Sequence, residues 1–236
     1  MTNRIADQSP LKAARMAGFL YLIFMVTFAS STFVQSGPIV HGDAAATARN
    51  ILAHVWLFRI GVISELFSAV FFLLAAWALY ELLKPVNKAL ALLFVLFLLG
   101  GVAIECVNSL NHFASQLLLS DADYLKVFRP DQLQALSMFF LNLGYKGGTV
   151  AGLFYGIWLF PLGYLVYKSG FLPKILGILL IMDGFCLLAC FFQVFLFPGY
   201  ERMMYPLYPV MFIAEFGLTL WLLIKGVKHQ PLDASA

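Results

Sequence analysis

The chain has 236 residues, of which 62% are hydrophobic and 11% are charged, with a formal net charge of +3 and a mean hydropathy of +0.88. Ordinary soluble domains are about 45–50% apolar and about 25% charged. This composition excludes a soluble globular enzyme and a disordered chain. The basic residues lie singly at the ends of apolar runs, so no basic patch could follow a phosphate backbone, and we expect no nucleic-acid partner.

Six apolar segments are long enough to cross a membrane, since a transmembrane helix needs about 20 mainly apolar residues. They lie at about 12–35, 55–82, 87–119, 133–167, 173–197 and 205–225. We therefore expect an all-α polytopic membrane helix bundle with six transmembrane helices. No soluble domain stands beside it, so residues 1–236 are expected to form a single transmembrane domain.

Two connecting segments indicate short additional helices. Asp43 can cap a helix built from the alanines that follow it, and this helix would run into the second span. The residues Ser120-Asp-Ala-Asp suggest another short helix, which must end before Pro130. Both segments fall on the side that the orientation below makes the outer one.

The distribution of Lys and Arg predicts the orientation, because cytoplasmic loops carry the excess of these residues. With the N-terminus inside, the inner bases are Arg4, Lys12, Arg15, Lys84, Lys88, Lys168, Lys174, Lys225 and Lys228. The outer bases are Arg49, Lys126, Arg129 and Arg202. Nine inner bases against four outer ones predict that both termini are cytoplasmic, an N-in/C-in topology.

Six sequence segments resemble a known family in the same order along the chain. They are Asp43–Ala53, Leu57–Gly61, Leu79–Lys88, Gln132–Leu136, Leu172–Gly177 and Phe197–Tyr200. From about Ala14 to Val227 the chain resembles the DUF4386 family of bacterial six-span membrane proteins, a domain of unknown function. The resemblance implies a multi-pass protein of the cytoplasmic (inner) membrane of a bacterium. It implies no activity, cofactor or catalytic residue.

Several ionisable residues fall within the apolar spans, where each costs roughly 2.5–3.5 kcal/mol on insertion scales. They are Arg59, Glu65, Glu105, His112, Lys146, Asp183 and Glu215. Such groups usually face a bundle interior or an aqueous cavity. At about 1.5 Å per residue, Glu65, Glu105, Lys146, Asp183 and Glu215 would share one layer roughly 14–22 Å below the outer surface.

Polar residues also recur at helical spacing on two spans. Gly101, Glu105, Asn108, His112 and Ser115 form one stripe on the third span, and Asn142 and Lys146 lie on one face of the fourth. We therefore predict an outward-facing polar cavity lined by Arg59, Glu65, Glu105, Asn108, His112, Asn142, Lys146, Asp183 and Glu215. The alternative is a set of buried ion pairs that fix the helix register. Four acids against two bases do not balance, which favours a functional cavity.

The fourth span also carries glycines every four residues, at Gly144, Gly148, Gly152 and Gly156. This spacing is typical of a ridge that lets another helix approach closely. We therefore expect Gly148→Leu and Gly152→Leu each to destabilise the bundle. Lys146 lies about 200° around the helix from Gly148, so we expect it to point into the bundle and to meet Glu65, Glu105, Asp183 or Glu215.

Several chemistries lack support. Only His112 is a histidine within a span, so a zinc site is not expected, although a carboxylate site for a harder cation stays open. The three cysteines fit neither a disulfide framework nor a Cys-x-x-Cys redox motif, and no Gly-x-Ser-x-Gly elbow occurs. We expect no metal and no cofactor.

The leading hypothesis is binding or transport of a small molecule or a lipid headgroup in the polar cavity. A second hypothesis is an intramembrane enzyme that acts on a lipid, with Glu105 or Glu65 as general acid or base and His112 assisting. A third is a structural or accessory membrane protein whose charges only pair. Taken together, the sequence observations favour a protein that is not an enzyme. Membrane lipids are the expected partners, and a homo-oligomer is compatible with the sequence.

Overall fold

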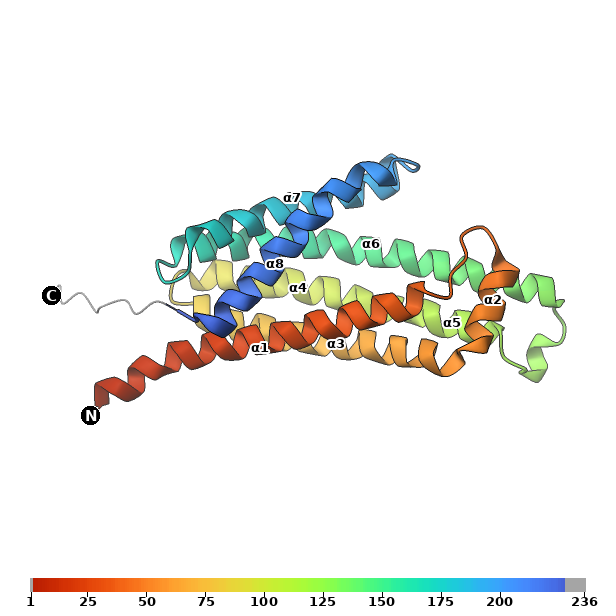
Figure 1. Ribbon diagram of the computed structural model, residues 1–236, viewed down its shortest axis with the longest axis horizontal. Helices are drawn as coiled ribbons and strands as arrows, with labels where there is room; N and C mark the ends of the chain where they lie inside the picture. The colour runs from red at the N-terminus through yellow and green to blue at the C-terminus, as the bar shows by residue number, and fades with distance from the viewer. Residues whose placement is uncertain (1, 228–236) are drawn as a thin grey trace. The chain divides into compact units, whose positions relative to one another are not determined.

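The computed structural model describes residues 2–227, with side chains from residue 10 onward, and the described residues form helices and loops without any strand (Figure 1). The α-helices are α1 (Thr2–Ser36), α2 (Ala44–Ala53), α3 (Val55–Leu83), α4 (Lys88–Asn108), α5 (Leu110–Leu118), α6 (Pro130–Lys168), α7 (Lys174–Leu196) and α8 (Tyr208–Ile224). Two 3-10 helices are η1 (Asp123–Leu125) and η2 (Glu201–Leu207). The predicted all-α class is confirmed. Lys228, which the orientation argument used, lies outside the described residues.

Six helical segments are long and apolar enough to cross a membrane. They are Pro10–Ser36, Val55–Leu83, Lys88–Leu118, Pro130–Lys168, Lys174–Leu196 and Glu201–Ile224. Lipid offers no hydrogen-bond partner to the backbone, so a spanning segment keeps these bonds within itself as a helix. The six predicted spans are confirmed, and the protein is a multi-pass membrane protein. The N-in/C-in orientation stays a prediction.

The connecting helices follow from local signals. The backbone N–H of Ala46 donates to Oδ1 of Asp43 at 2.8 Å, which satisfies one of the free N–H groups at the start of α2. The predicted helix after Asp43 is thus present, and it ends just before α3 begins. The predicted helix near Ser120 is shorter than a regular helix, since only the three residues of η1 form a 3-10 turn.

The chain divides into two compact units. Unit 1 is formed by the described parts of Met1–Ile23, Phe71–Val102 and Thr149–Ala236, and unit 2 by Phe24–Val70 and Ala103–Gly148. Each unit therefore contains parts of α1, α3, the α4–α5 segment and α6, while α7 and α8 belong to unit 1. The single transmembrane domain expected from the sequence stays a prediction.

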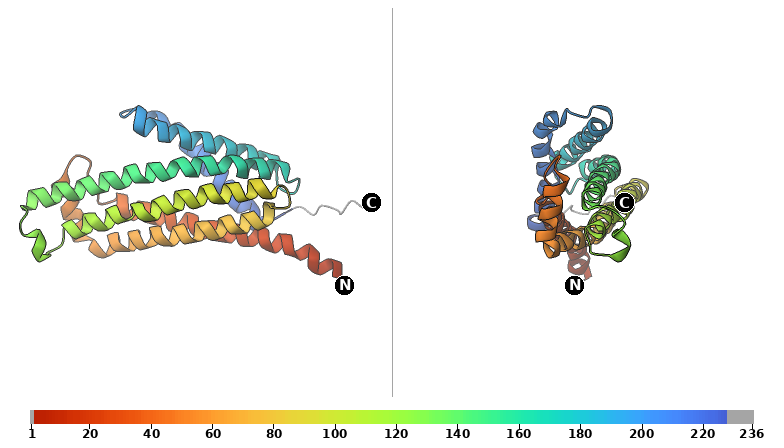
Figure 2. Two further views of the ribbon diagram at one scale, coloured as in Figure 1. Left: turned by 180° about the vertical axis from the view of Figure 1, so that it is seen from behind. Right: turned by 90° about the vertical axis from the view of Figure 1, so that its right-hand side faces the viewer.

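In unit 1, glycines allow α6 and α7 to approach closely, and the two helices run side by side in both views of Figure 2. A Cβ atom placed on Gly163 would lie 2.7 Å from the carbonyl oxygen of Gly177. One placed on Gly184 would lie 2.9 Å from the carbonyl oxygen of Gly156. Neither distance is compatible with a real side chain, so these backbones touch because both partners are glycine.

Also in unit 1, the first and last helices meet. A Cβ atom on Gly18 of α1 would lie 2.9 Å from Cβ of Leu222 on α8, and Gly226 lies against Leu11. The first part of α1 therefore lies beside the end of α8. This contact is compatible with an even number of spans, which places both ends of the chain on the same side of the membrane.

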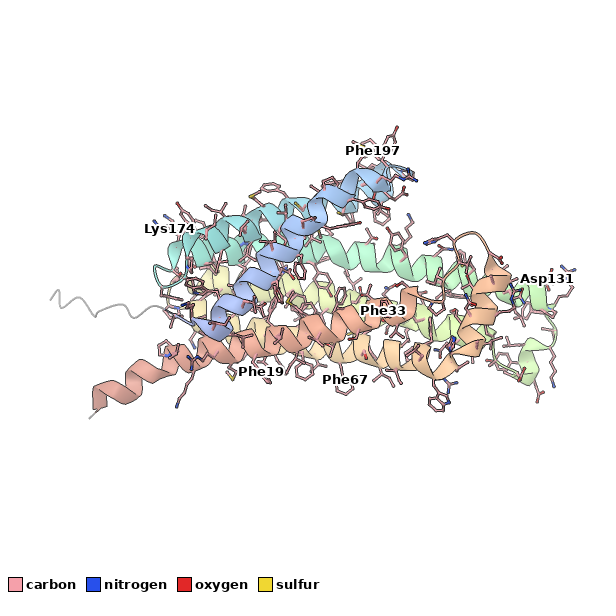
Figure 3. All side chains as sticks on the ribbon, in the orientation of Figure 1. Phe19, Phe33, Phe67, Asp131, Lys174 and Phe197 are labelled. Atoms are coloured by element: carbon pink, nitrogen blue, oxygen red, sulfur yellow. The ribbon has the colours of Figure 1, made fainter. Side chains whose placement is uncertain are left out.

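Each unit has its own packed interior. In unit 1, Phe72 packs edge-on against Trp158, with ring centroids 5.2 Å apart. In unit 2, Ile51, Phe58, Val62 and Leu141 form a buried cluster. Large apolar side chains also point outward: Phe19, Phe33 and Phe67 project from their helices in Figure 3. Outward-facing phenylalanine is expected of helices that contact lipid.

We predict that Gly163→Ala lowers the stability of the protein by about 1–3 kcal/mol, because the new methyl group would overlap the α7 backbone. Gly152→Ala is the matched control on the same helix. Nothing lies within 4 Å of a Cβ atom at Gly152, so the substitution there should be neutral or slightly stabilising. Thermal unfolding in detergent micelles measures both, and equal melting temperatures would contradict the close approach of α6 and α7.

Candidate functional site

Glu65 on α3 is the centre of a buried polar cluster in unit 2. Its residue surface is only 5% exposed. Nε2 of Gln35 donates to Oε2 of Glu65 at 2.8 Å and also reaches Oγ of Ser31 at 2.8 Å. Nδ1 of His112 lies 3.2 Å from the same Oε2, within ion-pair distance but outside the angles of a hydrogen bond. Oε1 of Glu65 is buried and has no hydrogen-bond partner among the described residues.

The third span is locally irregular at this cluster, where α4 passes into α5 at Ser109, but the helical hydrogen bond from Ser109 to the carbonyl of Glu105 is kept at 2.9 Å. The side chains at this irregularity satisfy backbone carbonyl groups locally. Oγ of Ser109 donates to the carbonyl of Cys106 at 2.8 Å, and Nδ2 of Asn111 donates to the carbonyl of Asn108 at 3.0 Å. Irregular backbone within a membrane requires such replacement partners. Interrupted helices are a recurrent feature of binding sites in membrane proteins.

Glu105 and Asn108 face the glycines of α6. Nδ2 of Asn108 donates to the carbonyl of Gly144 at 2.9 Å. A Cβ atom on Gly147 would overlap Oδ1 of Asn108, and one on Gly148 would lie 3.7 Å from Oε2 of Glu105. The glycine face of α6 therefore makes room for polar side chains that a larger residue would displace.

His112 and Ser115 continue the same stripe toward the end of α5. Nε2 of His112 would lie 3.4 Å from a Cβ atom on Gly144. Ser115 and Ser137 share a hydrogen bond of 2.8 Å between α5 and α6. The polar stripe predicted on the third span is thus present from Glu105 to Ser115, and it faces α6.

The charges inside unit 2 are mainly acidic. The groups that act on Glu105 are the carboxyl of Glu65, both by its charge and as a hydrogen-bonding neighbour, the imidazole of His112 and the carboxamide of Asn108. The lysines and arginines of unit 2 are exposed: Arg49, Arg59, Lys126, Arg129 and Lys146. Two carboxyls and one histidine therefore share an interior whose bases lie at the protein surface.

Three residues predicted to line the cavity lie elsewhere, and this is a correction. Arg59, Asn142 and Lys146 are exposed. The guanidinium of Arg59 lies 5.2 Å from the ring of Trp56, and the ammonium of Lys146 lies 5.8 Å from the ring of Tyr145. Nδ2 of Asn142 donates to the carbonyl of Met138 at 2.9 Å, within its own helix. An aromatic neighbour lets a cation stay at the surface rather than enter the bundle, so the expectation that Lys146 points inward is wrong.

The predicted four-glycine ridge of α6 is divided between different neighbours. Gly144 and Gly148 face polar side chains of α4 and α5 in unit 2, while Gly156 faces Gly184 of α7 in unit 1. Gly152 faces no atom within 4 Å. The expectation that Gly152→Leu destabilises a helix contact is therefore corrected, because no neighbour approaches that position.

The remaining two predicted residues, Asp183 and Glu215, belong to unit 1. Asp183 on α7 is 1% exposed, and the charge of Glu215 on α8 acts on it. Glu215 interacts with the phenol of Tyr21 on α1. The acids predicted to share one layer thus form two clusters, one in each unit: Glu65 with Glu105, and Asp183 with Glu215.

The sequence did not single out Gln35, Asn111 or the irregularity at Ser109. Gln35 lies near the end of the first span, but Ser31 and Gln35 at i and i+4 place two polar side chains on one helix face, which is a usable signal. No proline or glycine in the sequence indicates the irregularity at Ser109. The polar residues Asn108, Ser109 and Asn111 are its only sign in the sequence, because their side chains compete for backbone hydrogen bonds.

Other kinds of site find little support among the described residues. No three His, Cys, Asp or Glu side chains in that part of the chain converge as a metal-binding group. Two surface grooves occur in unit 1, one between α4 and α6 beside Pro161 and one near Gln193 at the end of α7. Both are mainly apolar and contain neither acid pair, so the carboxyl clusters are the stronger candidates.

The fold and these clusters define a class: a multi-pass α-helical membrane protein with carboxyl groups buried between its helices. The chain belongs to the family described as Domain of unknown function (DUF4386), whose model matches residues 16–226. It is similar to an uncharacterized protein of Archaeoglobus fulgidus, with 34% identity over 157 residues, which are 65% of this chain and 75% of that protein. No solved structure shows significant similarity to the chain. The family resemblance seen in the sequence is confirmed.

We predict that Gly147→Ala displaces the Asn108 carboxamide and breaks its bond to Gly144, at a cost of about 1–3 kcal/mol. The same substitution should cost much less in an Asn108→Ala background, because the overlapping side chain is then gone. Thermal unfolding of the wild type, both single variants and the double variant gives the coupling between the two positions. Additive effects would contradict the contact.

Proposed function

We propose that the protein binds an ammonium-bearing molecule, either a small solute or a lipid headgroup, at the Glu65–Glu105–His112 cluster of unit 2. The observation that carries the proposal is the pairing of two neighbouring carboxyls, Glu65 and Glu105, in which Oε1 of Glu65 is buried and accepts no hydrogen bond from a described N–H group. Leaving such an acceptor without a partner costs about 1–3 kcal/mol or more for a charged group. A ligand that donates hydrogen bonds and carries a positive charge would recover this cost.

The surrounding groups support a cationic ligand. Glu65 and Glu105 give the cluster up to two negative charges, and His112 can supply one positive charge only when protonated. An ammonium group provides three donors for carboxylate oxygens and balances the remaining charge. A bound cation and a protonated His112 would both be attracted to Glu65, so they compete.

The experiment measures ligand-dependent thermal stability, because a ligand that binds the folded state raises it by mass action. Ethanolamine is the soluble probe. Nanodiscs of phosphatidylethanolamine, compared with phosphatidylcholine, test the headgroup source. We expect a higher melting temperature with one of these sources, and loss of the increase in Glu65→Gln, which keeps the side-chain shape but removes the charge.

Glu81→Gln is the matched control, because Glu81 is partly exposed and pairs with Lys84 at 2.6 Å outside the cluster. Its response to the probe should equal that of the wild type. If the probe raised the melting temperature of Glu65→Gln as much as that of the wild type, this would contradict the proposed site. No shift with either source would contradict the ammonium ligand.

A second candidate function is an enzyme that acts on a lipid, and the contact between Nδ1 of His112 and Glu65 favours it. A carboxylate at Nδ1 orients an imidazole and stabilises its charged form, as a general base requires. Turnover of phosphatidylethanolamine by the purified protein, lost in His112→Gln, would distinguish this function from binding alone.

We also infer that the protein resides in the cytoplasmic membrane of a bacterium, with both termini inside. The excess of Lys and Arg on one side of the six spans supports this orientation. The loop that contains α2 would then lie outside, and the ligand would enter unit 2 from that side.

The orientation predicts that a fusion after Ala236 lies in the cytoplasm, so that only a reporter active in the cytoplasm gives a signal there. A fusion within the loop around Gly42, which lies between the first two spans, should give the opposite result. Alkaline phosphatase and a fluorescent protein serve as the paired reporters, since each is active on one side only. Phosphatase activity from the Ala236 fusion would overturn the proposed topology.

A further inference from the structure

Unit 1 contains a second pair of acids, on different helices from the proposed ligand site. Asp183 lies on α7 and is 1% exposed, while Glu215 lies on α8 and is half-buried. The two helices pack against one another. Oδ1 of Asp183 is buried without a hydrogen-bond partner among the described side chains. The proposed ligand binding in unit 2 uses neither residue.

In the described part of unit 1, the lysines and arginines lie at or near the protein surface. Its bases there are exposed at Lys12, Arg15, Lys88, Lys168, Lys174, Arg202 and Lys225. Lys84 is half-buried, but it pairs with Glu81 at 2.6 Å. The other titratable groups around the acids are the phenol of Tyr21 on α1 and the thiols of Cys186 and Cys190, on which the charge of Asp183 acts. None of these can supply a positive charge.

Two ionised carboxylates on packed helices would therefore share an apolar surrounding that contains no described lysine or arginine. Burial disfavours each charge, and the two charges repel each other, so such pairs hold a proton in common. The two acids differ in their surroundings, because the phenol of Tyr21 interacts with the half-buried Glu215, whereas Asp183 is 1% exposed. No described donor reaches Oδ1 of Asp183, and a proton on this carboxyl group would remove its uncompensated negative charge.

We propose that Asp183 and Glu215 form an intramembrane proton-binding pair, in which the more deeply buried Asp183 carries one exchangeable proton and Glu215, on the neighbouring helix α8, carries the charge. The pair gives unit 1 a single buried negative charge rather than two. Its proton can leave only when a positive charge approaches or when the helices separate. This is the behaviour of a proton site coupled to a change in α7–α8 packing.

Infrared spectroscopy tests the proposal on the full-length wild-type protein in nanodiscs, because a protonated carboxyl has its own absorption band. Labelling aspartate with carbon-13 shifts only bands that arise from aspartate. Among the aspartates whose side chains the structure describes, Asp43, Asp121, Asp123 and Asp131 are exposed, in the loops or at a helix start, whereas Asp183 is buried. We expect an isotope-shifted band of a protonated aspartate at neutral pH. Its absence would overturn the proposal without any substitution.

Substitutions then assign the band. Asp183→Asn should abolish it, and Glu65→Gln, in the other unit, should leave it unchanged. Glu215→Gln removes the repelling charge, so the aspartate band should disappear at a lower pH than in the wild type. A purely structural hydrogen-bonding role would not produce this shift. A band that persists in Asp183→Asn, or that has the same pH dependence in Glu215→Gln, would overturn the shared-proton pair.

Discussion

The cost of placing a carboxylate away from water is the constraint on which the interior of this protein depends. Each unit buries acids and keeps its described lysines and arginines at or near the surface. Helix bundles in lipid usually pair such charges, because an unpaired buried charge is expensive. Here the buried carboxyl groups are compensated by an amide hydrogen bond to Glu65, by a nearby imidazole and phenol, and by protons or bound cations. Both proposals follow from that imbalance.

Unit 2 shows how the helices make space for polar groups. Asn108 and Glu105 occupy volume that side chains on α6 would otherwise fill, and the glycines at 144, 147 and 148 leave it open. At the irregularity around Ser109, the hydroxyl of Ser109 and the carboxamide of Asn111 donate to backbone carbonyls of the same span. Glycine on one helix and irregular backbone on the next are therefore parts of one arrangement, which holds a polar cluster between apolar helices.

Unit 1 uses glycine differently. The backbones of α6 and α7 touch at Gly163 and Gly177, where no polar side chain intervenes. Its acids lie on α7 and α8, and a phenol from α1 approaches one of them. The two clusters thus differ in composition: amides and a histidine surround Glu65, whereas a tyrosine interacts with Glu215. Membership of a family described as a domain of unknown function leaves the chemistry of each cluster to be established by the experiments above.

The sequence by itself determined the six spans, because about 20 apolar residues in succession can satisfy their backbone in lipid only as a helix. It also determined which residues carry unusual polarity, since Glu65, Glu105, His112, Asp183 and Glu215 each interrupt an apolar run. Only the tertiary structure decided the direction in which each side chain points. In a soluble helix the polar face marks the outside, whereas a lipid-facing surface is as apolar as a packed one, so periodicity does not distinguish them. For that reason Lys146 and Asn142 lie outside, Gln35 joins Glu65, and the glycines of one helix serve two different neighbours.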